Sequence, residues 1–333
     1  MLTLLLERET FPREKVCGDC LNPSCTPVLK RLELAERVRA LPHGKVSRVD
    51  FVAIGGRVVS VDLPRDAEIA VKRSLFDHLL MTRAREIGAI VRDGTTASVL
   101  TPPQVQRDNW KIGTPNETFE AHTLVAADGR NSSVARMLGL LPRPEKERVG
   151  LQTHLPLPPN FGDRIVLQFL PEGYSGQAPV GDNQLNLCLV GKPAEMPALR
   201  RWAEKEFGLS PTHTWRTITP LRRAALAPAN ERLFLIGDAA RVVEPFTGEG
   251  IYYALRSGEL AAGAIASFIG SGDTAAAARS YTVAHDKLYC GRLWVNRIAR
   301  AAVLWPRMTS FMLRSRMTSP AILRALTAKI VPS

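Results

Sequence analysis

The chain has 333 residues, of which 45% are hydrophobic, and a formal net charge of +12. This length allows a sizeable core and favours two domains. No uninterrupted apolar run reaches the roughly 18 residues that a membrane-spanning helix needs, so we expect no span of a bilayer. Five cysteines without an evident paired framework indicate a reducing cytoplasm.

The positive charge is concentrated at one end of the chain. Residues 287–333 contain nine Lys or Arg and no Asp or Glu, so only +3 of the net +12 remains for residues 1–286. On a helix drawn at 100° per residue, basic side chains face one side and large apolar ones another: Arg292, Arg297, Arg300 and Arg307, against Trp294, Ile298 and Trp305. Pro306 should interrupt this helix.

Two interpretations of this basic tail stay open. A helix with basic and aromatic faces suits peripheral contact with a membrane surface. A helix packed on the body of the protein, with its basic face in solvent, explains the pattern equally well. We expect no binding of nucleic acid, because the rest of the chain has little excess charge and no recognisable binding module.

The first ninety residues predict short elements of both kinds. An apolar strand over residues 2–6 ends at Glu7, and a short helix over residues 27–39 follows. Residues 46–54 and 57–63 predict two strands joined at Gly55-Gly56, which is a hairpin signal. Further elements are a helix over residues 73–87 and a strand over residues 89–92.

The next part of the chain is rich in strands. Residues 99–125 predict a β-meander that leads into an Ala-Asp-Gly turn. Residues 164–170, 176–180 and 184–190 predict strands of a further sheet, separated by turn residues. Tyr174 precedes the second of these strands, where it either lines a substrate cavity or packs within the sheet.

The most informative segment is a strand, an acidic turn and a long helix within residues 233–269. The apolar residues 233–236 end at Gly237-Asp238, which delivers a carboxylate to the edge of a sheet where α/β folds bind ligands. Glycines at 248 and 250 let the backbone approach a ligand, and the helix over residues 251–269 offers free N–H groups at its start. A further helix is expected over residues 273–285.

Three segments resemble the FAD-dependent oxidoreductases of the geranylgeranyl reductase and aromatic-ring hydroxylase type. G-D-A-A, a proline and T-G-E-G-I, from Gly237 to Ile251, match the second flavin motif of this family. Residues 124–136 resemble its D-G motif, although Arg136 falls one place later than in many members. Residues 15–21 resemble the Cys-Gly-x-x-Leu segment of the reductase branch.

The resemblance implies an α/β fold in which a Rossmann-like FAD/NAD(P)-binding domain is interleaved with a β-sheet substrate domain, followed by C-terminal helices. We assign residues 1–45, 73–142 and 229–286 to the FAD-binding domain. Residues 46–72 and 143–228 form the substrate domain, and residues 287–333 form the basic tail.

The resemblance also implies the residues of the site. Asp238 would accept hydrogen bonds from ribityl hydroxyls, and Arg73 opens the family pattern R-x-x-F-D. Cys17 and Tyr174 are the candidates for a catalytic role. No metal site is expected. The cofactor-binding residues implied are Glu7, Arg8, Lys15, Cys17, Gly18, Arg73, Asp128, Gly129, Gly237, Asp238, Ala239, Pro245, Gly248, Glu249, Gly250 and Ile251.

One expected motif is missing. A dinucleotide-binding unit carries G-x-G-x-x-G roughly 20 residues before the acidic residue that holds the ribose, which here is Glu7. No such pattern occurs in the sequence. We therefore expect an N-terminally truncated unit, most simply because the assigned start lies too far downstream. The chain could also be a fragment of a longer protein or the product of a truncated relic gene.

The implied function is reduction of C=C bonds in an isoprenoid or other lipid-like substrate by hydride transfer from flavin N5, with NAD(P)H as the electron donor. One alternative is a monooxygenase that hydroxylates an aromatic or polyketide-like substrate. A second alternative is a truncated remnant without catalysis. In each case we expect a cytoplasmic protein with a small hydrophobic ligand, associated at most with a membrane surface.

Overall fold

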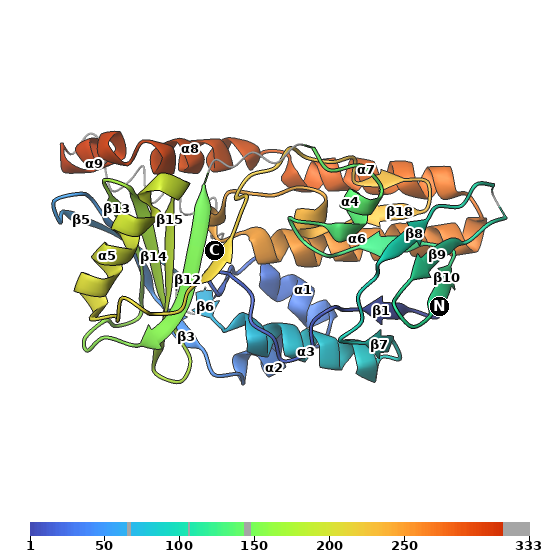
Figure 1. Cartoon of the computed structure of the whole chain (residues 1–333), viewed down its shortest axis with the longest axis horizontal. Helices are drawn as coiled ribbons and strands as arrows, with labels where there is room; N and C mark the ends of the chain where they lie inside the picture. Colours follow the sequence, from blue (N-terminus) through green and yellow to red (C-terminus); the bar gives the residue numbers. More distant parts are fainter. Residues whose placement is uncertain (65–67, 106, 143–147, 316–333) are drawn as a thin grey trace.

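The computed structural model describes residues 1–64, 68–105, 107–142 and 148–315. Figure 1 shows an elongated molecule with a large sheet at one end and short strands beside long helices at the other. Two C-terminal helices, α8 (Leu293–Leu304) and α9 (Pro306–Arg314), run along one long edge. The α/β class predicted from the sequence is confirmed, with strands from distant parts of the chain in each sheet.

The large sheet has seven strands in the order β16-β12-β15-β14-β13-β4-β5. Neighbours are antiparallel except β4 and β13, which run parallel. The predicted hairpin at Gly55-Gly56 is confirmed as the turn between β4 and β5. The strands are β4 (Arg48–Val52), β5 (Val58–Asp62), β12 (Val149–Pro156), β13 (Arg164–Leu170), β14 (Gly173–Val180), β15 (Gln184–Gly191) and β16 (Arg216–Ile218).

The two faces of this sheet have different neighbours. Leu185, Leu187 and Leu189 of β15 are fully buried against α5 (Met196–Phe207), which covers one face. Because side chains alternate along a strand, Asn186 and Cys188 point to the opposite face, which we call the inner face. Both side chains contact the Cys17 carbonyl there.

The other half contains two separate parallel pairs of strands. β1 (Leu4–Leu6) pairs with β7 (Ile90–Arg92), and β11 (Leu124–Ala126) pairs with β18 (Leu233–Leu235). β17 (Ala229–Asn230) adds an antiparallel edge to β18. In a doubly wound sheet, the first strand of the dinucleotide-binding unit lies in the middle, between two groups of parallel strands. Within the part of the chain that the structure describes, no strand joins β1 to β11.

Two small antiparallel sheets complete the strands. The predicted meander is confirmed as β8 (Val99–Thr101), β9 (Trp110–Gly113) and β10 (Thr118–Ala121). β6 (Glu68–Ala70) lies between β2 (Cys20–Leu21) and β3 (Gly44–Val46).

Most helices begin close to their predicted positions. The predictions for residues 73–87, 251–269 and 273–285 are confirmed as α3 (Arg73–Glu86), α6 (Gly250–Ser271) and α7 (Thr274–Tyr289). Phe234 of β18 packs against α6 and α7 in one apolar cluster. A short α4 (Ser133–Met137) follows β11, and Ser132 caps it by accepting from the Ala135 amide at 2.9 Å.

The single helix predicted over residues 27–39 is wrong. The structure has α1 (Cys25–Arg31) and α2 (Ala35–Arg39), because Glu33 takes a left-handed backbone with φ of 59°. This conformation ends a helix. The break at Pro306 is confirmed, since α8 ends at Leu304 and α9 starts at the proline.

The prediction that Arg292 lies on the solvated basic face is also wrong. Arg292 Nη1 lies 2.8 Å from Oε1 of buried Glu249, so this arginine turns toward the body of the protein. Its place on a helical wheel gave only an angle, whereas its ion-pair partner lies 43 residues earlier in the chain. Among residues 1–64, 68–105, 107–142 and 148–315, no helix is long and apolar enough to cross a membrane.

Stability should fall on mild acidification because of His285. This side chain is 1% exposed between Tyr281 and Tyr289, and its burial, aided by Arg241, lowers its pKa to about 4. The unfolded chain binds a proton below about pH 6.5 and the folded state resists it until about pH 4, so stability is lost across that window. The loss is on the order of 3 kcal/mol.

Urea denaturation at pH 7.5 and pH 5 measures this loss. His285→Gln should lose less stability than the original protein over the same interval, because glutamine does not titrate. Equal losses in both proteins would show that other groups cause the acid sensitivity.

Candidate functional site

The two acidic turns meet at one edge of the β11-β18 pair. The parallel register places Leu124 opposite Leu233 and Ala126 opposite Leu235, so both strands end at the same level. Arg130 Nη2, after the first turn, lies 3.2 Å from Oδ2 of Asp238 in the second. The sequence prediction that Asp238 is delivered to this edge is confirmed by its position.

Gly237 lets α6 approach the end of β18. Its φ is 53°, and a Cβ at this position would lie 3.0 Å from Cβ of Ala254. Its amide donates to Ser257 Oγ at 2.8 Å. Glycine is therefore required here for both backbone conformation and close packing.

Two arginines leave unused donors beside Asp238. Arg223 Nη2 donates to the carbonyl oxygens of Asp238 and Ala239 at 2.5 and 2.7 Å. Arg223 Nε and Nη1 and Arg130 Nη1 are buried and, within the described residues, lack a hydrogen-bond partner. Burial lowers the pKa of Arg223. Buried guanidinium donors without a protein acceptor fit an anionic ligand.

A second group of cations lies around Asp77. Arg73 makes two hydrogen bonds to its carboxylate at 2.8 and 2.9 Å, and Arg13 adds one at 2.8 Å. Repulsion from Arg73, followed by burial, lowers the pKa of Lys15, while attraction to Asp77 and Asp238 opposes this change.

Sequence reasoning missed a buried polar network under the Cys-Gly segment. Asp19 is 1% exposed, and its Oδ2 lies 2.7 Å from His154 Nε2 and 2.8 Å from Asn186 Nδ2. Burial raises the pKa of Asp19. Asn186 also donates to the Cys17 carbonyl at 2.8 Å, so the network fixes this segment to the inner face.

A signal for this network was present in the sequence. Gln152 and His154, and Asn186 and Cys188 in the strand predicted over residues 184–190, place polar or thiol side chains at alternate positions. Such alternation assigns them to one face of a sheet. What the sequence could not supply was the acidic partner, which lies 135 residues before His154.

The loop before α6 meets the Cys-Gly segment. Ile251 packs in a buried cluster with Cys25 and Phe76, and Cys17 contacts the same cluster. Gly18, Gly129, Gly248 and Gly250 face open space, because a Cβ at each would meet no other heavy atom within 4 Å. Each of these three distant segments thus borders open space.

Several predicted residues have mainly structural contacts. Glu249 is 1% exposed and its partner is Arg292, and burial raises the pKa of Glu249. Glu244 precedes Pro245, a predicted cofactor-binding residue. Its carboxylate accepts hydrogen bonds from Arg148 at 2.7 and 3.0 Å, a buried ion pair that the sequence did not predict. A cofactor contact by Glu249 stays a prediction.

The predicted residues near the N-terminus lie at the end of β1. Glu7 follows the strand, with Oε2 3.7 Å from Arg13 Nη2. Arg8 is paired with Glu9 at 3.1 Å and its side chain is 69% exposed. These positions allow contact with a ligand from solvent, but their cofactor roles stay predictions.

Tyr174 is part of the core. It is 4% exposed, lies edge-on to Phe246 with ring centroids 5.2 Å apart, and packs with Phe169 and Val190. Burial raises the pKa of its hydroxyl. These contacts agree with the packing interpretation, and its catalytic role stays a prediction.

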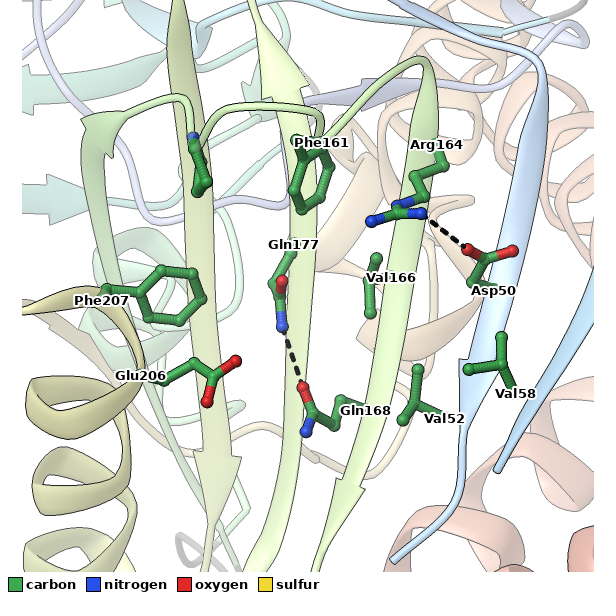
Figure 2. A pocket seen from close by; sticks show the side chains of 11 residues that line it. Asp50, Val52, Val58, Phe161, Arg164, Val166, Gln168, Gln177, Glu206 and Phe207 are labelled. Carbon is green, nitrogen blue, oxygen red and sulfur yellow. Dashed lines mark hydrogen bonds and ion pairs between the residues drawn. The ribbon is translucent and has the colours of Figure 1, made fainter. Parts of the chain in front are cut away.

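A separate hollow of about 280 Å³ lies on the face of the large sheet opposite the inner face. Figure 2 shows its lining, where Gln177 donates to Gln168 and Arg164 pairs with Asp50. It is therefore separate from the Cys17 segment, which contacts the inner face. Among the residues that the structure describes, no cluster of His, Cys, Asp or Glu could hold a metal ion.

No family model matches the chain. Curated relatives do. The menaquinone reductase of Mycolicibacterium smegmatis is 28% identical over 295 residues, which cover 78% of this chain and 69% of the relative. The digeranylgeranylglycerophospholipid reductase of Methanosphaerula palustris is 30% identical over 256 residues, or 70% of this chain and 63% of the relative.

Solved structures share the fold over nearly the whole chain. The p-nitrophenol 4-monooxygenase PnpA of Pseudomonas putida superposes with a TM-score of 0.79 over 98% of this chain and 90% of that chain. Its sequence identity is 16%, so the likeness concerns the fold alone.

Gly237→Ala should destabilise the protein by about 1–3 kcal/mol, because the new methyl group meets Ala254 and the backbone is left-handed. Gly263→Ala is the matched control. Gly263 lies within α6 and faces open space, so alanine should stabilise the helix by up to about 1 kcal/mol. Urea denaturation of both variants measures the difference, and a neutral Gly237→Ala would contradict the close packing.

Proposed function

Because the chain resembles FAD-dependent oxidoreductases of the geranylgeranyl reductase and aromatic-ring hydroxylase type, and its curated relatives include two reductases, we propose that it reduces C=C bonds of an isoprenoid or other lipid-like substrate. The observation that carries this proposal is that α6 lies beside both segments: Ile251 at its start packs with the Cys17 cluster, and Gly237, next to Asp238, packs against Ala254 of the same helix. We propose that the open space bordering these segments is one region, which we call the open region. We further propose that FAD binds there and that NAD(P)H supplies the electrons.

The residues of the open region fit the parts of FAD. The Asp238 carboxylate suits ribityl hydroxyls, and the unpartnered donors of Arg130 and Arg223 suit an anionic group. The N-terminus of α6 begins at Gly250 and favours negative charge at the ring of a reduced flavin. When bound, FAD would supply the hydride chemistry, while the protein sets orientation and electrostatics.

Cys17 is the residue that we propose beside the reacting centre. Burial favours the neutral form of Arg73, but attraction to Asp77 and Cys17 outweighs it and raises the pKa of Arg73. A thiol next to this guanidinium could give a proton to the carbon neighbouring the hydride acceptor. The Asp19 network holds the Cys17 carbonyl, so it would act as a positioning device.

Reduction is favoured over oxygen insertion by the named relatives. Both relatives above are reductases, one of a quinone and one of a prenylated lipid, at 28 and 30% identity. The chain spans 69 and 63% of their lengths, so their activities are transferred here only as a proposal. Hydroxylation stays the second candidate, because the fold is shared with a monooxygenase.

Flavin binding tests the site. The purified full-length protein should be yellow or bind added FAD. Asp238→Asn should weaken that binding by about 10–100-fold, because hydrogen bonds to a charged group contribute about 1.5–3 kcal/mol. Asp62→Asn, at an exposed position of β5, is the control and should bind normally. A folded protein that takes up no flavin would refute the proposal and favour the non-catalytic remnant.

Turnover distinguishes the two reactions. With a prenyl lipid, the protein should consume one NAD(P)H per double bond without uptake of oxygen, and should also work under anaerobic conditions. Product formation that requires oxygen would instead establish a hydroxylase.

A further inference from the structure

Helices α8 and α9 expose an unusual number of large apolar side chains. Among the described residues, the exposed fractions on these two helices are Trp294 45%, Ile298 46%, Trp305 63%, Met308 54%, Phe311 57% and Met312 40%. We call these six residues the outer stripe. Trp294 and Ile298 are four residues apart in α8, so at 100° per residue they lie roughly 40° apart on one side of this helix.

The outer stripe is separate from the apolar side that holds the helices to the body. Val303 and Leu313 are buried in the cluster that contains Phe169 and Tyr174 of the large sheet. Ser310 Oγ accepts from the Ile54 amide at 3.0 Å, which fixes α9 beside β4. The outer stripe therefore cannot be the core-facing side of a loosely placed helix pair.

Positive charge accompanies the outer stripe. Arg297, Arg307 and Arg314 are exposed on the same two helices, and Arg57 donates to the Arg314 carbonyl beside them. Residues 287–333 carry nine Lys or Arg and no Asp or Glu. Any partner of this surface must match both large apolar groups and a strongly basic charge.

We propose that the outer stripe docks on the surface of an anionic lipid bilayer, with α8 and α9 lying in the plane of the interface. Tryptophan and other large apolar groups enter the headgroup region, while arginines bind lipid phosphates. Figure 1 shows both helices along one long edge of the molecule, so the contact would extend along this edge. The proposal depends only on this surface and is independent of flavin binding.

A bilayer fits this surface better than a second copy of the chain does. A symmetric dimer through the outer stripe would bring the exposed Arg297, Arg307 and Arg314 of two copies close together, with repulsion between like charges. An anionic bilayer offers complementary charge over its whole area. The two sequence interpretations of the tail are thereby combined, since the helices pack on the body and still present an apolar basic surface.

Vesicle sedimentation of the full-length protein tests the proposal. Vesicles of phosphatidylcholine with about one third phosphatidylglycerol should bind the protein, and pure phosphatidylcholine vesicles should bind it much more weakly. The double variant Trp305→Ser/Phe311→Ser should bind at least about tenfold more weakly, because both side chains are more than half exposed and would enter the interface. The variant Arg297→Gln/Arg307→Gln should lose about fivefold per charge at low salt.

Ile87→Ser/Val99→Ser is the matched control, since these side chains are 66 and 59% exposed outside the outer stripe. It should bind vesicles like the original protein. Unchanged thermal unfolding and an unchanged flavin spectrum would show that the outer-stripe variants are folded and that any failure concerns the surface alone. Binding that is absent, or equal in all variants, would overturn the proposal. A dimer in analytical ultracentrifugation that Trp305→Ser/Phe311→Ser dissociates, without vesicle binding, would assign the surface to a second copy instead.

Discussion

The parallel pairing of β11 with β18 is the interaction on which the site depends. Its register brings Asp128 and Asp238, 110 residues apart in the sequence, to one edge of the sheet. The two strands pair over three residues, which is too short a pairing to be stable by itself. The packing of Phe234 against α6 and α7, and the close approach of α6 at Gly237, hold the pair in place. The backbone of the site is thus positioned by the same contacts that form the core.

Buried charges attach the remaining parts of the site to this frame. Asp19 joins the Cys17 segment to the inner face of the large sheet, and the Arg148–Glu244 pair anchors the loop before α6 to the start of β12. Burying such groups costs free energy unless every partner is in place. Apolar residues of similar size could fill the same space at no loss of stability. The buried charges therefore contribute a defined arrangement of the segments that they join rather than additional stability. This arrangement fixes the Cys17 segment and the loop before α6 to the large sheet.

The sequence predicted the elements that rest on local pattern. The strand over residues 164–170 and the start of α3 at Arg73 agree with the structure to the residue, because apolar runs and turn signals define them. Partners that lie far apart in the chain were not predictable. His154 gave no hint of Asp19, and a helical wheel assigned Arg292 to solvent because it contains no information about Glu249. The break at Glu33 was also missed, because glutamate rarely adopts the left-handed backbone that it has here.

The C-terminal helices connect the outer surface with the loop of the site. In the first turn of α8 and just before it, the Glu244 amide donates to Asn296 at 3.0 Å, and Arg292 pairs with Glu249 at 2.8 Å. These bonds hold both ends of the loop that precedes α6. The same helix carries Trp294 and Ile298 on its opposite side. Whatever covers the outer stripe therefore lies one helix diameter, about 10 Å, from the loop that surrounds the open region. If the outer stripe binds a bilayer as we propose, a substrate dissolved in that bilayer would approach the loop before α6 from the side at which the protein is held.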